Sequence, residues 1–499
     1  MASEQTPLTK QGSSGCVNTC DLKEERRCND IFFVILYLLA FGVVLALFSM
    51  YGGEVLTYAG DHLVQKQHKF KYALNICASI AGGSVLLSML WVGIMLCLGA
   101  WLIWICAGVA IAGSVVAGFL ASKFMKDNGD DTWFWLPATL GSLVAILLTV
   151  YICCIRKRIA FASANLQIAC RAILTYPVIL LVAFFNTLLI GAWVLVWSVA
   201  TYAAMNHGEY INSDGQGYNN VQKFSIFAAL LLVFFWTLFV VRNIVHVTVS
   251  GTVATWWYRA DNNRVPLTTL RALYNAVVLS FGSICFGSLI VSVIETIKTI
   301  LEIFRNLAKQ SHNAVAVCLL GCLECIVGCI SNLVQYFNKY AYSYVGIYGF
   351  SFLRAGKETF ELFEKMGWSA IANDALIDNV LIAGSIFVGI GGAAAGYGAV
   401  SYDRHYNNNV WTQNLENPTA TLGTAGLLIG FSICYIVMAV INSSVATTFV
   451  LFAEDPHSLH HSHPHDYEDL HQAWNEIYPE EYAKNPHGTK ADNQAIQHT

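Results

Sequence analysis

Long apolar runs separated by short polar stretches fill most of the chain between residues 31 and 447. A helix rises about 1.5 Å per residue, so crossing the ~30 Å hydrocarbon core of a bilayer takes about 20 apolar residues. Runs of that length lie near residues 31–51, 72–97, 99–122, 133–154, 172–204, 222–249, 273–300, 313–336, 374–401 and 420–447. The pattern predicts an all-α fold, a polytopic membrane helix bundle with about ten transmembrane helices. The division between the second and third runs, near Gly99, is the least distinct.

The runs and their flanks predict an N-terminal tail over 1–30, one transmembrane domain over 31–447 and a C-terminal tail over 448–499. The first run lacks a small-residue cleavage site, so we expect a retained span rather than a signal peptide. Lys and Arg gather on the cytoplasmic side of membrane proteins. With ten spans, a cytoplasmic N-terminus places on that side the basic groups within residues 23–27, 156–158, 259–271 and 354–365. We therefore expect both tails in the cytoplasm.

The composition supports a membrane protein. Of the 499 residues, 56% are hydrophobic and only 12% are charged. A soluble globular protein has about 25% charged residues because its surface faces water. The missing charge indicates a surface that mostly contacts lipid. The small formal net charge of −4, without a basic stripe, argues against nucleic acid as a partner.

Small residues spaced four apart let membrane helices pack closely. Such faces occur at Gly108/Ala112, Gly113/Ala117 and Gly392/Gly396. Static packing seams explain these faces. The glycine-rich stretch 389–396 also suits a helix that slides or bends in a moving protein, and the sequence leaves both readings open.

Fifteen cysteines and a histidine-rich stretch are the residues best suited to bind a metal. One face of the run 313–336 carries Cys318, Cys322, Cys325 and Cys329. The outer two lie about 16 Å apart along a helix, too far for a single zinc ion. We expect these cysteines to face neighbouring helices, or to be acylated near a cytoplasmic end. Cys153 and Cys154, just before a basic cluster, also suit acylation.

The stretch 457–465 contains an HxxHH pattern like the histidine boxes of di-iron membrane enzymes. Those enzymes need several boxes, and the sequence has no second one, so we expect a solvated tail and no metal. The chain also lacks HExxH, GxSxG, P-loop and GxGxxG motifs in a suitable setting. We therefore predict no catalytic residues, no cofactor and no enzyme.

Polar groups inside a bilayer are costly unless paired, so those present mark packing contacts or a pathway. The run 222–249 is the richest, with Arg242, Asn243 and His246 within two turns. Arg242 suits a position that reaches toward the interface. Asn243 and His246 either hold a neighbouring helix or line a substrate route.

Four tryptophans lie within or just past the runs 172–204 and 222–249, namely Trp193, Trp197, Trp236 and Trp256. A quaternary ammonium group has no N–H to donate, so proteins surround it with aromatic faces. Such a cage needs few acids, which fits a chain with few intramembrane carboxylates. We predict that these tryptophans, with Asn243 and His246, bind a substrate at a site lined by the fifth to eighth runs.

Four stretches carry a family resemblance. They are VTVSGTVATWWY at 247–258, GSICFGSLI at 282–290, NKYAYSYVGIYG at 338–349 and FVLFAEDP at 449–456. Through them the sequence resembles the choline transporter-like family, of the fungal or protist type, over residues 220–456. The N-terminal half resembles it by helix count. Two features depart from the family: the external loop expected near 52–71 is much shorter than in animal members, and Glu295 replaces a neutral or basic residue.

The resemblance implies a ten-helix carrier with cytoplasmic termini that moves choline or a related amine, such as ethanolamine, by alternating access. Gly251 and Gly287 would permit close helix approach. The implied partners are a small organic cation and the lipid bilayer, and the location is the plasma membrane or an organelle, with the plasma membrane preferred. The alternatives are a non-transporting membrane scaffold or channel linked to lipid metabolism, and a lipid enzyme using the tail histidines.

Overall fold

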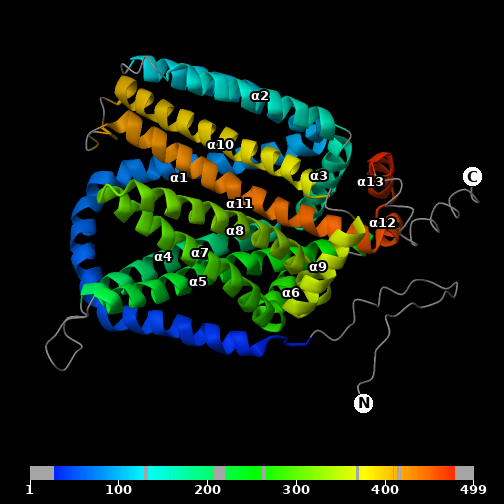
Figure 1. Cartoon of the computed structure of the whole chain (residues 1–499), viewed down its shortest axis with the longest axis horizontal. Coiled ribbons are helices and arrows are strands. Elements are labelled where there is room, and N and C mark those ends of the chain that lie inside the picture. Colours follow the sequence, from blue (N-terminus) through cyan, green and yellow to red (C-terminus); the bar gives the residue numbers. More distant parts are fainter. Residues whose placement is uncertain are drawn as a thin grey trace, which may run out of the picture.

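The structure, a computed structural model, describes residues 27–127, 133–156, 158–206, 220–260, 266–366, 370–407, 410–412, 415 and 417–477. Its regular elements are α-helices and one π-helical turn, so the all-α prediction is confirmed (Figure 1). They are α1 (Ile31–Asp127), α2 (Trp135–Ile155), α3 (Arg158–Thr175), α4 (Val178–Asn206), α5 (Asn220–Trp257), α6 (Thr268–Tyr274), η3 (Asn275–Leu279), α7 (Phe281–Gln310), α8 (Ala314–Tyr348), α9 (Phe352–Met366), α10 (Ala370–Tyr406), α11 (Pro418–Glu454), α12 (Pro456–Ser462) and α13 (Pro464–Ile477).

Among the described residues, nine helical stretches are long and apolar enough to cross a membrane. The longest, Tyr72–Asp127, has 56 residues. If straight it would be about 84 Å long, more than twice the thickness of the hydrocarbon core. It breaks at Leu98, where φ is −127° and ψ is 25°. The break falls where the sequence divided the second and third runs.

The part of α1 that follows Leu98 runs back along α2, starting beside α3. A Cβ on Gly99 would lie 2.9 Å from Ser163 Oγ of α3. A Cβ on Gly118 would lie 3.1 Å from Gly141 Cα of α2. Since α2 and α3 are consecutive, the chain returns across the bundle after Leu98, and the nine stretches make ten crossings.

Both ends of the described chain lie at the same end of the bundle, which agrees with an even number of crossings. Asn29 Nδ2, before α1, donates to the carbonyl of Gly349 at 3.1 Å. Tyr344 of α8 donates to Glu454, the last residue of α11, at 2.7 Å. We call this the α9 end, because α9 begins here, close to the described start of the chain (Figure 1).

The stretch 52–71, expected as an external loop, has a helical backbone that continues α1. The prediction of a loop was wrong because polar composition alone does not end a helix. Between Pro7 and Pro137 the chain has no proline, so no residue there lacks the backbone N–H that a helix requires. By contrast, Pro177 separates α3 from α4, and the predicted run 172–204 begins as a helix only at Val178.

Glycines bring α10 and α11 into backbone contact. A Cβ on Gly392 would collide with the carbonyl of Gly426, and one on Gly396 would collide with that of Leu422. The Gly392/Gly396 face is therefore a packing seam, as one reading of the sequence predicted. Gly108 and Gly113 have no atom within 4 Å of the Cβ position. Their faces are not seams, and the close contact in this part of α1 lies at Gly118 instead.

The C-terminal segment folds back onto the bundle, and it is not the solvated tail that we expected. Trp474 of α13 is fully buried, with its ring centroid 4.8 Å from that of Phe161 on α3 and 5.4 Å from that of Phe452 on α11. Arg171 of α3 pairs with Asp466 of α13. The α9 end is thereby covered by α12 and α13 up to Ile477, and residues 478–499 lie outside the described part of the chain.

Candidate functional site

The polar residues of α5 join this helix to three neighbours. Asn243 Nδ2 donates to Ser288 Oγ of α7 at 3.0 Å. The ring of His246 lies between two hydroxyls, with Nδ1 2.9 Å from Ser443 Oγ of α11 and Nε2 3.2 Å from Ser343 Oγ of α8. Asn243 and His246 thus hold neighbouring helices, and His246 is 9% exposed.

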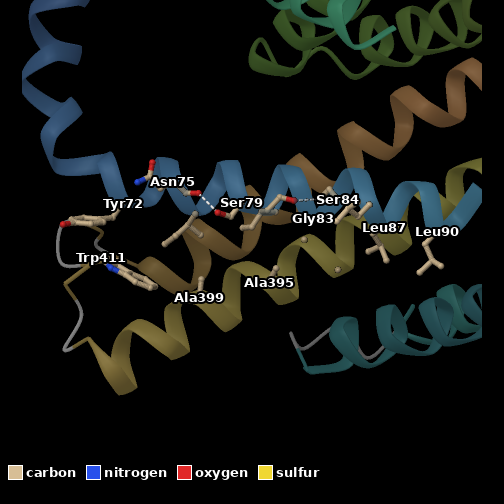
Figure 2. A pocket seen from close by; sticks show the side chains of 15 residues that line it. Tyr72, Asn75, Ser79, Gly83, Ser84, Leu87, Leu90, Ala395, Ala399 and Trp411 are labelled. Carbon is tan, nitrogen blue, oxygen red and sulfur yellow. Dashed lines mark hydrogen bonds between the residues drawn. The ribbon is translucent and has the colours of Figure 1, made fainter. Parts of the chain in front are cut away.

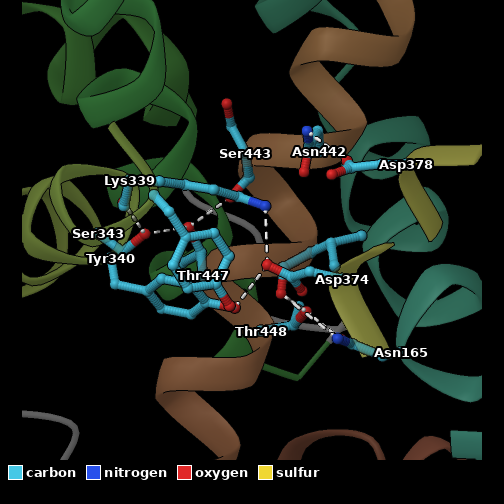
Figure 3. A network of polar contacts seen from close by, with 12 residues as sticks. Asn165, Lys339, Tyr340, Ser343, Asp374, Asp378, Asn442, Ser443, Thr447 and Thr448 are labelled. Atoms are coloured by element: carbon cyan, nitrogen blue, oxygen red, sulfur yellow. Dashed lines mark hydrogen bonds and ion pairs between the residues drawn. The ribbon is translucent and has the colours of Figure 1, made fainter. Parts of the chain in front are cut away.

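An ion pair connects α8 with α10 close to Ser343, one of the hydroxyl partners of this histidine (Figure 3). Lys339 Nζ lies 3.0 Å from Asp374 Oδ2, and the Tyr340 hydroxyl donates to the same oxygen at 2.7 Å. The ammonium group of Lys339 also lies 5.8 Å from the centroid of the Tyr340 ring. One turn further along α10, Asp378 accepts a hydrogen bond from Asn442 Nδ2 at 2.9 Å. Two carboxyl groups and one ammonium group therefore meet inside the bundle.

Hydroxyl groups link these contacts. Ser343 Oγ donates to the Lys339 carbonyl at 3.2 Å and lies 3.5 Å from Thr447 Oγ1 of α11. Thr447 in turn lies 2.8 Å from Ser250 Oγ of α5. Water cannot satisfy polar groups in the hydrocarbon core, so their partners must come from the protein. We call this set the central polar network: His246, Ser250, Lys339, Tyr340, Ser343, Asp374, Asp378, Asn442, Ser443 and Thr447.

The four predicted tryptophans do not meet at this network. The indole N–H groups of Trp193 and Trp197 donate to carbonyls of α5, at 3.3 Å to Phe234 and 2.8 Å to Leu230. Both side chains therefore join α4 to α5, and they pack with apolar residues of α1, α4 and α5.

Trp236 and Trp256 lie far apart on α5. The Trp236 N–H donates to the Cys285 carbonyl of α7 at 2.9 Å. The Trp256 ring stacks on His463 near the α9 end, with centroids 4.0 Å apart. The two tryptophans are about 30 Å apart along the helix, so a single ammonium ion cannot contact both. The four tryptophans therefore do not form a single cage in this structure.

Several aromatic side chains near the network are tyrosines of α8, which the sequence analysis missed. Tyr340, Tyr342 and Tyr344 are each at most 2% exposed. The Tyr336 ring lies 5.4 Å from that of Tyr340. We had ended the span at residue 336, whereas α8 continues to Tyr348. The available signal was Lys339 among tyrosines, together with Asp374 and Asp378 spaced one turn apart.

The predicted glycine contacts on α5 and α7 are present. A Cβ on Gly251 would lie 3.3 Å from the carbonyl of Gly346 on α8. A Cβ on Gly287 would lie 2.5 Å from the Tyr342 hydroxyl and would collide with the Phe352 ring. These glycines allow α5, α7 and α8 to approach closely enough for the network to form.

A groove of about 890 Å³ lies elsewhere, between the second crossing of α1 and α10 (Figure 2). Apolar side chains of α1 and small residues of α10 form most of its wall. Its serine hydroxyls are already used, since Ser79 donates to the Asn75 carbonyl and Ser84 to that of Ile80. Leu86, on the rim, is 73% exposed. The groove therefore opens toward the lipid, away from the helices predicted to line a substrate site.

The cysteine stripe of α8 does not face other helices as we had expected. All four of its cysteines, Cys318, Cys322, Cys325 and Cys329, are exposed and free. Within the described residues no cluster of three or more His, Cys, Asp or Glu side chains has the geometry to hold a metal ion.

The fold and the central polar network define a multi-pass membrane protein with a paired, charged interior. The sequence pattern of the plasma-membrane choline transporter family matches residues 139–457. The chain belongs to this family, and the resemblance predicted from its four stretches is confirmed.

The relatives include fungal and protist proteins. The chain is 31% identical to Protein PNS1 of Yarrowia lipolytica over 65% of its length and 58% of that protein. It is 30% identical to Protein PNS1 of Saccharomyces cerevisiae over 64% of its length and 61% of that protein. A CTL-like protein of Dictyostelium discoideum is 30% identical over 67% of this chain and 56% of that protein. The chain thus matches about three fifths of the length of these relatives.

Proposed function

We propose that this protein carries choline, or a related small organic cation such as ethanolamine, across a membrane by alternating access. The observation that carries the proposal is the buried carboxylate of Asp374, which is 4% exposed and lies beside the Tyr340 ring within the crossing helices. Membership of the plasma-membrane choline transporter family supports the same substrate class.

The chemistry of the network suits such a cation. A quaternary ammonium offers no N–H for a hydrogen bond, so aromatic faces bind it. A nearby carboxylate compensates its charge inside the membrane. Asp374 supplies the charge and Tyr340 an aromatic face. Asn243 and His246, as predicted from the sequence, would orient the helices or the substrate hydroxyl. The four predicted tryptophans, Trp193, Trp197, Trp236 and Trp256, would support the helices around this site. They would not form its walls.

We also propose that the protein acts in the plasma membrane with its termini in the cytoplasm. The basic residues at the α9 end include Arg156, just after α2, and Arg158, the first residue of α3, together with Arg354 and Lys357 of α9. The excess of Lys and Arg on cytoplasmic loops supports this orientation. Protease digestion of a C-terminal tag in right-side-out and inverted vesicles tests it.

Uptake of labelled choline into proteoliposomes tests the function. We expect saturable uptake, inhibited by unlabelled choline and ethanolamine, because a carrier presents a limited number of sites. Uptake no faster than in protein-free liposomes, for every amine tried, would contradict the proposal. Flux that rises linearly with concentration and carries current would favour a channel instead.

A further inference from the structure

The central polar network already holds a cation, and that cation belongs to the protein. Lys339 is bound to the Asp374 carboxylate at 3.0 Å and lies 5.8 Å from the Tyr340 ring centroid. A carboxylate and an aromatic face are the groups that an organic ammonium ion requires. The Lys339 ammonium therefore occupies the position that we assign to the substrate.

We propose that Lys339 is an internal substitute for the transported cation. Its ammonium group neutralises Asp374 while the carrier is empty, and it leaves the carboxylate when the ammonium group of the substrate arrives. This inference rests on the proposed function and names the residue that lets the empty carrier return.

The physical reason is the cost of an uncompensated charge in the membrane. A buried carboxylate without a partner is strongly unfavourable in a medium of low dielectric constant. A carrier that delivers its cation leaves such a carboxylate behind. Lys339 has a flexible four-carbon chain, and its side chain is 17% exposed, against 5% for Asp374. It can therefore withdraw and return, while Asp374 stays fixed by Tyr340.

The pair also connects two helices that must rearrange. Lys339 belongs to α8 and Asp374 to α10, so exchange of the lysine for substrate breaks one link between these helices. Asp378, one turn from Asp374, is held by the neutral amide of Asn442. It adds a second carboxyl group that can attract an entering cation.

A second ion pair provides a matched control. Lys298 lies 3.5 Å from Glu295, three residues away on the same helix, and its side chain is 38% exposed. Glu295 is also held by Ser331 and Gln335 of α8, at 2.5 Å and 3.1 Å. Removing the Lys298 charge leaves Glu295 with two hydrogen-bond donors and leaves the central polar network unchanged.

The test compares net uptake with exchange of choline for choline in Lys339→Gln proteoliposomes. Net uptake requires the empty carrier to reorient across the membrane. During choline–choline exchange the carrier reorients with choline bound. We expect net uptake to fall at least about tenfold because the unpaired carboxylate opposes return, while exchange stays within about threefold of wild type. Lys298→Gln should leave the ratio of the two rates unchanged. Equal reductions of both rates in Lys339→Gln would overturn the proposal, while transport by the wild type would still stand.

A measurement on the wild-type protein avoids any effect of the substitution on folding. The amine of Lys339 should react faster with a membrane-permeant acylating reagent when choline is saturating, because the substrate displaces it from Asp374. Peptide mass spectrometry measures this rate, with Lys298 as the internal reference. Unchanged or slower labelling of Lys339 in the presence of choline would overturn the proposal. Absence of all amine transport by the wild type would instead refute the proposed function itself.

Discussion

Two buried aspartates of α10 show how context decides the role of a single residue. Asp403 is fully buried, and among the described residues the donors to its carboxylate are neutral groups in the turn that follows α10: the N–H groups of Trp411 and Thr412 and the Thr412 hydroxyl. Asp374 instead faces an ammonium group and a phenol from another helix. Asp403 therefore stabilises a turn, whereas Asp374 is available to a cation.

Replacing each aspartate by asparagine should separate these roles. Asp374→Asn should lower the kcat/KM for choline uptake at least about tenfold, because an amide cannot neutralise a cation in a low-dielectric site. Its thermal stability should also fall, because the Lys339 ammonium loses its charged partner even though the amide oxygen still accepts from Tyr340. Asp403→Asn should lower the Tm and leave the KM for choline near the wild-type value. Uptake assays and thermal denaturation in detergent measure both, and normal uptake by Asp374→Asn would contradict this assignment.

The sequence identified Asn243 and His246 because both interrupt one apolar run. It did not identify Lys339 and Asp374 as a pair, because they lie on different helices and meet only through packing. The tryptophans failed for a related reason. The indole N–H groups of Trp193, Trp197 and Trp236 each donate to a backbone carbonyl of a neighbouring helix, whereas the Trp256 ring stacks on His463. No pattern within a single helix predicts these partners.

At the scale of helices, close approach depends on both partners. The spacing of small residues predicted seams at Gly108, Gly113 and Gly392 alike, but only Gly392 meets a facing glycine, Gly426. Gly118, which the spacing did not single out, contacts Gly141 and Pro137 of α2. One helix therefore shows where a seam is allowed, and the facing helix decides whether it forms.

The α10–α11 seam gives a controlled test on one helix. Gly396→Ala places a methyl group against the carbonyl of Leu422, whereas Gly398 has open space at its Cβ position. We expect Gly396→Ala to destabilise the protein by about 1–3 kcal/mol through overpacking. Gly398→Ala should be neutral or stabilising by up to about 1 kcal/mol, because alanine favours helix. Thermal denaturation of both variants measures this difference. Equal melting temperatures would show that α10 and α11 can move apart at Gly396 without loss of stability.

At the scale of the whole molecule, the sequence predicted about ten crossings, and the described part of the chain makes ten once the longest of its nine apolar stretches is divided at Leu98. The prediction succeeded because hydropathy fixes the length of each crossing. Hydropathy could not predict the helical backbone of residues 52–71 or the packing of α13 on α3. Trp474 is one aromatic residue in a polar segment, and its burial depends on Phe161 and Phe452 from distant parts of the chain.

The position of the central polar network along α5 is asymmetric. His246 lies about 17 Å from the Trp257 end and about 39 Å from the Asn220 end of this helix. We therefore expect a cation that enters from the Asn220 end to cross most of the transmembrane electric field before it reaches Asp374. Moving one elementary charge through 100 mV changes its free energy by about 2.3 kcal/mol.

The apparent affinity for choline should consequently depend on voltage when choline is supplied from the Asn220 end, and only weakly when it is supplied from the α9 end. Proteoliposomes of known orientation with an imposed potassium diffusion potential measure this difference. An inside-negative potential that draws choline inward should lower its KM on the sensitive side. Equal sensitivity on the two sides would place the substrate near the middle of the field, so the depth of one histidine determines which face of the membrane controls loading.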